Sequence, residues 1–243
     1  MRYLGTLSYD GTSYNGWQKQ PDAPSIQAEV ERVFSLILNT PIEVYASGRT
    51  DRGVHARGQT FHFDCDKPFV IDKLIGGFNS LVNTDIHLEK LKLVKDDFHA
   101  RYAAKSKVYA YVINNGTYSP FNRRFAMHIR DKLNVDLMKK ASLSLIGTHD
   151  FKDFTTKIED DGNFIRHISS IKIIVKSNML RFDIAGNGFM TYMVRFIVGT
   201  LVAIGQGRED ASFIPKHLDQ MTRNVISYKA EPQGLFLMKV NYK

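Results

Sequence analysis

The chain has 243 residues, enough for one large domain or two small ones with a sizeable core. Lysine and arginine number 33 against 25 aspartate and glutamate residues, so the formal charge is +8 and a polyanionic partner is favoured. The single cysteine, Cys65, excludes an intramolecular disulfide and any zinc site built from several cysteines.

The sequence contains none of the common motifs of metal or nucleotide sites. Its eight histidines form no close pair at metal-ligand spacing, and HExxH, CxxC and GxxxxGK are all absent. We therefore expect neither a metal site of these types nor nucleotide hydrolysis.

Nothing in the sequence predicts export or membrane insertion. The first residues, MRYLGTLSYDG, have no apolar core of signal-peptide length. The longest apolar run, residues 189–204, is shorter than the roughly 20 residues that span a bilayer, and Arg195 lies in its middle. We expect a cytoplasmic protein in which this run forms a buried helix.

The first part of the chain predicts six elements in the order β-α-β-β-α-β, which is typical of a ferredoxin-like unit. Ser25 is suited to cap the first helix, whose apolar residues recur at helical spacing from Ile26 to Ile37. The expected elements are strands at 2–9, 42–46, 59–64 and 86–94, and helices after Ser25 and at 72–82.

The second part of the chain predicts a similar mixture. Asn134 and Gly147 are cap candidates for its first helix, and Ser177 and Asn178 form a polar turn between two strands. The expected elements are strands at 107–113, 125–129, 168–175, 179–184 and 235–242, and helices at 135–146 and 189–205.

These elements predict an α+β protein with two ferredoxin-like or RRM-like halves. We place the halves at residues 1–104 and 105–243. No long Pro/Gly linker separates them, so we expect them to pack side by side with a basic cleft between them.

The stretch ASGRTDRGVHARGQ, residues 46–59, contains one carboxylate, Asp51, among several cationic side chains. Thr-Asp-Arg-Gly is also good turn chemistry, so a structural turn aspartate is the alternative. Three nearby arginines exceed what a turn requires and would keep the carboxylate ionised. An ionised carboxylate in a cationic loop suits attack at a sugar carbon while phosphates are held.

Residues 98–130 contain no aspartate or glutamate, whereas basic and aromatic residues alternate through the segment. Basic side chains neutralise phosphates and aromatic faces stack on unpaired bases, so we expect the segment as a whole to contact RNA. Alternating aromatics can also be ordinary core residues of a strand. For Tyr111 and Phe125 we expect this core role.

Several segments of the chain resemble the TruA-type tRNA pseudouridine synthases. GRTDRGVHARGQ resembles the signature of that family, and six further blocks follow the family's order along nearly the whole chain. Each block is a modest signal, but the ordered series is highly specific. The blocks are YDGTSYNGWQKQ (9–20), DDFHARYAA (96–104), KVYAYVI (107–113), LIGTHDF (145–151), GNGFMTYMVRFIVGTL (186–201) and GLFLMKVNY (234–242).

The resemblance implies isomerisation of uridine to pseudouridine at positions 38, 39 and 40 of the tRNA anticodon stem-loop. It implies a homodimer that needs no cofactor or metal. It assigns Asp51 as the catalytic aspartate, Arg49 as the residue that replaces the expelled base, Tyr109 as the stacking partner of the target uracil, and Arg195 as the partner of the aspartate.

Further basic residues near the motif and at the start of the second half are expected to contact RNA. His55 has the alternative of supporting the loop, and Trp17 is at least as well suited to packing as to RNA contact. The expected RNA-binding residues are Arg52, His55, Arg57, Lys105 and Lys107.

Two of the assignments can be weighed without the family. An arginine inside an apolar helix is costly unless it is paired, so Arg195 either pairs with Asp51, pairs with a structural acid, or reaches the surface. Tyr109 and Tyr111 share one face of a strand, so alternation does not choose between them.

Two other functions stay open at the level of residues. A non-catalytic RNA-binding protein with two RRM-like halves would use the same basic and aromatic surface, but the chain has no RNP-type run. A glycosidase or nucleoside hydrolase usually needs a second carboxylate or a metal, and the loop offers one acid.

Overall fold

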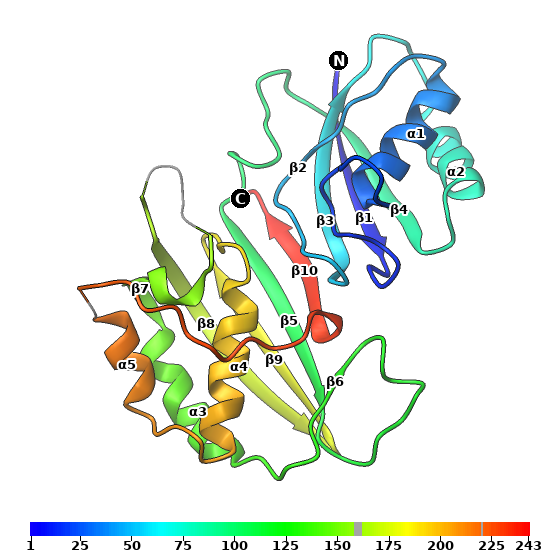
Figure 1. Ribbon diagram of the computed structural model, residues 1–243. Helices are drawn as coiled ribbons and strands as arrows, with labels where there is room; N and C mark the ends of the chain where they lie inside the picture. Colours follow the sequence, from blue (N-terminus) through cyan, green and yellow to red (C-terminus); the bar gives the residue numbers. More distant parts are fainter. Residues whose placement is uncertain (158–161, 220) are drawn as a thin grey trace. The chain divides into compact units, whose positions relative to one another are not determined.

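The computed structural model describes residues 1–157, 162–219 and 221–243. Its internal contacts divide the chain into a first unit, Met1–Lys105 with Phe236–Lys243, and a second unit, Ser106–Leu235 (Figure 1). Both units mix helices with strands, so the α+β class is confirmed. The closing segment groups with the first unit, and not with the residues after 104 as we expected, because its strand pairs with a strand of that unit.

The first unit has the predicted β-α-β-β-α-β order, followed at the end of the chain by one more strand. Along its sheet the order is β4-β1-β3-β10, with β2 paired to β3. The pairing of β3 with β10 is parallel, and the others are antiparallel. The elements are β1 (Arg2–Tyr9), α1 (Ile26–Leu38), β2 (Tyr45–Ala46), β3 (His55–Asp64), α2 (Ile71–Leu81), β4 (Ile86–Val94) and β10 (Leu235–Asn241).

The core of the first unit forms where the apolar faces of α1 and α2 meet the sheet. The Ser25 side chain accepts a hydrogen bond from Ala28 N, so the predicted cap of α1 is confirmed. Phe34 is fully buried, with its ring centroid 4.8 Å from that of Phe63 on β3 and 4.6 Å from that of Phe78 on α2.

The second unit contains a sheet with the strand order β5-β9-β8-β7, and β6 pairs with β5 in parallel. Asn134 caps α3 as predicted, accepting from Leu137 N. The elements are β5 (Ser106–Asn114), β6 (Met127–His128), α3 (Val135–Ser142), β7 (Gly147–Asp150), β8 (Ile165–Lys176), β9 (Met179–Gly186), α4 (Met193–Gly205) and α5 (Phe213–Leu218), with 3₁₀ turns η1 (Leu143–Leu145), η2 (Lys152–Phe154) and η3 (Pro232–Gly234).

Every residue of α4 is buried, which confirms that the long apolar run forms a core helix. Among the described residues no helix has both the length and the apolarity needed to cross a bilayer.

A buried polar contact joins η2 to α5. Asp153 on η2 is fully buried, and its carboxylate lies 2.7 Å from His217 Nδ1 on α5. The same carboxylate accepts from Asn224 N at 2.7 Å.

Several element bounds differ from the sequence prediction. β3 begins at His55 and not at residue 59, because Ala56 pairs with Tyr9 of β1 and His55 with Phe236 of β10. The helix expected to continue to residue 146 ends at Ser142 and tightens into η1. β7 and α5 were not predicted, since both are short and lack a clear periodic pattern.

Candidate active-site loop and its supporting residues

The predicted catalytic residue lies in the loop of residues 47–54, which connects β2 to β3 in the first unit. Asp51 is half-buried, whereas Arg49 and Arg52 are exposed. The loop thus brings one carboxylate and two guanidinium groups together within residues 49–52, as the sequence indicated. We call it the Asp51 loop.

A second loop, residues 10–17, supports the main chain of the Asp51 loop. Trp17 N donates to Thr50 O at 3.0 Å, and Gly53 N donates to Tyr14 O at 3.3 Å. Trp17 is 2% exposed, which confirms its packing role. The loop that carries the carboxylate is therefore held by backbone hydrogen bonds against a buried aromatic ring.

Gly16 makes this close approach possible. Its φ is +90°, a conformation that side chains disfavour, and a Cβ at this position would lie 2.5 Å from Thr50 O. The glycine in the turn-rich segment of residues 10–24 therefore allows the 10–17 loop to pack directly on the main chain of the Asp51 loop.

The other end of the Asp51 loop is fixed to β3 by side-chain hydrogen bonds. Gln59 is fully buried; its Nε2 donates to Gly48 O at 2.8 Å, and its Oε1 accepts from Ser47 Oγ at 2.9 Å. The loop is thus anchored on both sides of Asp51, which restricts the positions that the carboxylate can take.

The expected RNA-binding residues of the first unit differ in exposure. Arg52, Arg57 and Lys105 are exposed and can reach a phosphate. His55 is 1% exposed, accepts a hydrogen bond from Gly11 N at 3.0 Å and stacks on Phe236 with 4.7 Å between centroids. Its burial favours the alternative role, support of the two loops, over direct contact with RNA.

In the second unit the structure separates the two candidate tyrosines. Tyr111 is fully buried, and its hydroxyl donates to Glu231 O at 2.6 Å, as expected of a core residue. Burial raises the pKa of Tyr111. Tyr109 is 8% exposed and meets Phe189 edge-to-face with 5.2 Å between centroids. Lys107, two residues earlier on β5, is half-buried.

Arg195 lies in the first turn of α4 and is 9% exposed. Its Nε donates to Ala230 O at 2.8 Å, and Ala230 N in turn donates to Arg195 O at 3.0 Å. The guanidinium carbon lies 5.2 Å from the centroid of the Tyr192 ring. These contacts fix the orientation of a buried cation, so the alternative in which Arg195 reaches the surface is wrong.

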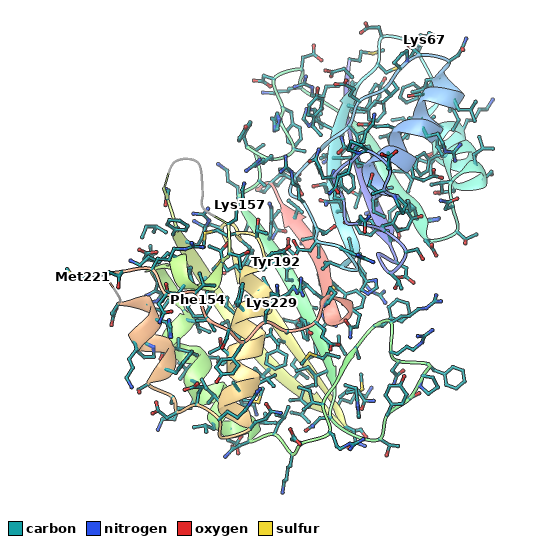
Figure 2. The ribbon with its side chains drawn as sticks, viewed as in Figure 1. Lys67, Phe154, Lys157, Tyr192, Met221 and Lys229 are labelled. Atoms are coloured by element: carbon teal, nitrogen blue, oxygen red, sulfur yellow. The ribbon has the colours of Figure 1, made fainter. Side chains whose placement is uncertain are left out.

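Tyr192 and Lys229 were not predicted as part of this arrangement (Figure 2). Tyr192 has a φ of +64°, which is costly for a residue other than glycine, and Lys229 Nζ lies 4.6 Å from its ring centroid. Residue 192 precedes Arg195 by three positions. In the helix that the sequence predicts over 189–205, this is the spacing of neighbours on one face, and it was the sequence signal that could have placed Tyr192 beside Arg195.

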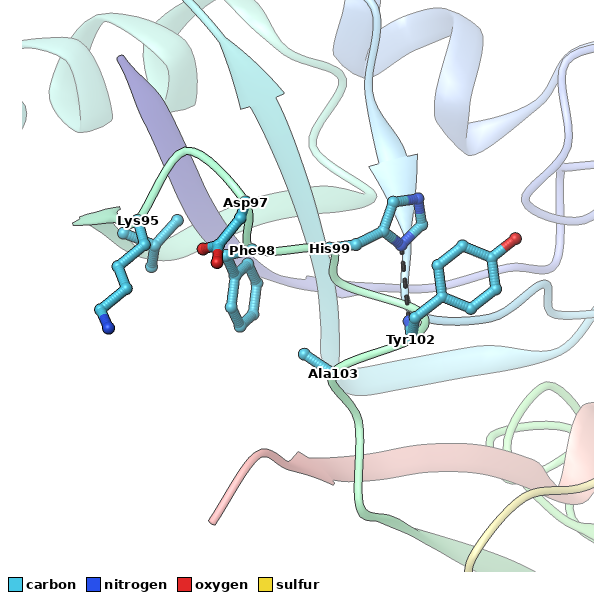
Figure 3. A pocket seen from close by; sticks show the side chains of 7 residues that line it. Lys95, Asp97, Phe98, His99, Tyr102 and Ala103 are labelled. Carbon is cyan, nitrogen blue, oxygen red and sulfur yellow. Dashed lines mark hydrogen bonds between the residues drawn. The ribbon is translucent and has the colours of Figure 1, made fainter.

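A surface hollow of about 510 Å³ lies in the first unit, and none of the predicted site residues lines it (Figure 3). It is lined by Val94, Lys95, Asp97, Phe98, His99, Tyr102 and Ala103. His99 packs edge-on against the buried His62 at 4.6 Å, and Ala100 N donates to His62 Nδ1. Burial, together with the neighbouring positive charges, lowers the pKa of His62 to about 4.

Comparison with known proteins connects these features to one family. Residues 7–103 and 141–243 match the family model described as tRNA pseudouridine synthase. The chain is 38% identical to tRNA pseudouridine synthase A of Streptococcus thermophilus strain CNRZ 1066, covering 100% of both chains. It is 37% identical to tRNA pseudouridine synthase A 2 of Bacillus cereus, covering 99% of both.

A third relative, tRNA pseudouridine synthase A of Lactococcus lactis subsp. cremoris, is 39% identical over 100% of this chain and 97% of its own. The matches extend through both units and include the Asp51 loop and α4. The chain belongs to the tRNA pseudouridine synthase family, a family of isomerases.

Proposed function

We propose that this protein converts uridine to pseudouridine at positions 38, 39 and 40 in the anticodon stem-loop of tRNA, with Asp51 as the catalytic residue. The observation that carries the proposal is the position of Asp51. It is the one acid in a cationic loop whose main chain is held on both sides, in a chain that matches tRNA pseudouridine synthases over its full length.

The proposed reaction breaks the bond between uracil N1 and ribose C1′, turns the base, and joins C5 to C1′. The proton on C5 is lost and N1 gains one, so no net redox change occurs and no redox cofactor is required. Asp51 either attacks C1′ or stabilises positive charge there while a proton leaves C2′, and in the second route C2′ regains a proton when C5 bonds to C1′. Both routes need an ionised carboxylate at a fixed position.

The target base must leave its stack before it can react, at a cost of a few kcal/mol. We propose that Arg49 occupies the vacated space, since it is exposed and two residues from Asp51. Tyr109 is proposed to cover the flipped uracil. The full burial of Tyr111 and the use of its hydroxyl by Glu231 O support the choice of Tyr109.

Arg195 is proposed to pair with Asp51 and to keep it deprotonated. The fixed orientation of its guanidinium group, through Ala230 O and the Tyr192 ring, supports a positioning role. We further propose that Arg52, Arg57, Lys105 and Lys107 neutralise phosphates, because all are at least partly accessible. His55 is not proposed to contact phosphates, because it is buried.

At the level of the whole molecule we propose two ferredoxin-like halves, which together form a basic cleft that holds the tRNA. We also propose a cytoplasmic homodimer. The β-α-β-β-α-β order of the first unit supports the ferredoxin-like architecture, and the formal charge of +8 supports a basic surface for tRNA. The homodimer rests on the family resemblance.

The test is to map pseudouridine in unmodified tRNA transcripts after incubation with the protein. We expect new pseudouridine at positions 38, 39 and 40, and none in transcripts that carry cytidine there. Tight tRNA binding without any product would favour the non-catalytic RNA-binding function instead. Product at other positions would contradict the proposed target.

The phosphate-binding role of Arg57 has a separate test. Arg57→Ala should weaken tRNA binding. It should also reduce the slope of log K against log salt by about 0.9, the value expected for the loss of one phosphate contact in a duplex. An unchanged slope at lower affinity would mean that Arg57 does not contact a phosphate.

A further inference from the structure

The loop between β5 and β6, residues 115–126, has a surface that the proposed catalytic chemistry does not use. Figure 1 shows it as a long green loop that extends away from the two strands that it connects. We call residues 118–125, with the sequence YSPFNRRF, the loop tip.

The base of this loop is well anchored. Asn115 Nδ2 donates to Ile129 O at 2.9 Å and to Asp131 O at 2.7 Å, and His128 Nε2 lies 2.9 Å from Gly116 O. Within the tip, Asn122 N donates to Ser119 O. The tip is therefore presented on a fixed base and is partly ordered by its own turn.

The aromatic residues of the tip remain at the surface. Phe121 is 90% exposed and Tyr118 55% exposed. Phe125, which we expected to be a core residue, is 43% exposed, so that expectation is wrong. A phenylalanine that is almost fully exposed gains none of the free energy of burial in the isolated chain, so a binding partner is the more natural explanation for it.

The charge around the tip indicates the kind of partner. Arg123 and Arg124 are both exposed, and residues 98–130 contain no acid. The same segment of a second copy of this chain would also offer no carboxylate to these two arginines. A polyanion that also offers flat apolar surfaces is complementary, and an RNA with unpaired bases has both properties.

We propose that the loop tip is a second tRNA contact, in which an unpaired base stacks on Phe121 while Arg123 and Arg124 neutralise the adjoining phosphates. The proposal rests on the tRNA-modifying function and adds a binding element that touches no reacting atom. It predicts an effect on tRNA affinity that is separate from the chemical step.

The test compares Phe121→Ala with wild type on an unmodified tRNA transcript. Loss of one stacked base should raise Kd and KM about 5- to 150-fold, while kcat at saturating tRNA stays unchanged. Phe121→Trp should restore binding, because it keeps an aromatic face. Met221→Ala is the matched control, since Met221 is 98% exposed in the same unit.

The double variant Arg123→Ala/Arg124→Ala should lower the slope of log K against log salt by about 1.4 to 1.8, the effect of two lost phosphate contacts. Thermal unfolding of each variant should match that of wild type, because the altered side chains are exposed.

Three outcomes would overturn the inference. Phe121→Ala could bind tRNA as wild type does, it could lower kcat without changing affinity, or it could change the oligomeric state in sedimentation while tRNA affinity is unaffected. The last result would assign the tip to a protein partner. If wild type itself neither binds nor modifies tRNA, it is the proposed function that fails.

Discussion

A single methyl group at Gly16 should disturb the Asp51 loop without altering any proposed catalytic residue. A Cβ at this position would lie 2.5 Å from Thr50 O, 3.0 Å from the Asp51 carbonyl carbon and 3.1 Å from Arg52 N. All three are main-chain atoms, so rotation of a side chain cannot relieve the contacts. The φ of +90° adds strain for any residue with a Cβ.

The expected loss of stability can be worked out from the backbone conformation of Gly16. A disfavoured backbone conformation costs about 1–3 kcal/mol, and a chain of this size loses about 2–4 °C of Tm per kcal/mol. Gly16→Ala should therefore lower Tm by about 2–12 °C. The matched control is Gly76→Ala in α2, because an added Cβ there would meet no heavy atom of another part of the chain within 4 Å. Alanine there should stabilise the helix by about 0.5–1 kcal/mol.

Thermal unfolding and single-turnover pseudouridine formation test both effects. A displacement of about 1 Å can slow an enzyme reaction about 100-fold, so Gly16→Ala should form product much more slowly while Gly76→Ala keeps the wild-type rate. If the two variants had the same Tm and the same rate, the claim that the 10–17 loop fixes the Asp51 loop would be refuted.

Three further substitutions test other parts of the structure. Because burial keeps the pKa of His62 near 4, below its ordinary value of 6.5, its contribution to stability is present above about pH 6.5 and is lost as the pH falls toward 4. Denaturation between about pH 7 and 4 should accordingly show a shallower loss for His62→Gln than for wild type. Tyr111→Phe removes the donation to Glu231 O and should cost about 0.5–1.5 kcal/mol of unfolding free energy in urea titrations. His217→Ala removes the side chain on α5 that hydrogen-bonds the buried Asp153 carboxylate and should cost about 1–3 kcal/mol by the same measurement; an unchanged unfolding free energy would contradict a stabilising role for this contact.

Local signals in the sequence predicted much of the fold. The Ser25 and Asn134 caps and the apolar run of α4 were found where expected, because capping and helical periodicity depend on residues close together in the chain. The start of β3 was predicted too late, since it depends on pairing with β10, which lies at the far end of the chain.

The candidate site was predicted less completely for the same reason. The motif located Asp51, but not the 10–17 loop that supports it or the strained Tyr192 beside Arg195. Strand alternation gave Tyr109 and Tyr111 equal standing; the full burial of Tyr111 and its hydrogen bond to a residue 120 positions away, which identify it as a core residue, could not be predicted from alternation. Phe125 was misassigned because an aromatic residue near a short strand usually belongs to the core.

The most direct test of the central claim compares wild type with Asp51→Asn on the same tRNA transcript, measuring binding and pseudouridine formation in parallel. Asparagine has almost the same shape but carries no negative charge and cannot act as an ionised nucleophile. We predict tRNA affinity close to that of wild type and no pseudouridine at positions 38, 39 and 40. Normal turnover by Asp51→Asn would contradict the assignment of Asp51 as the catalytic residue.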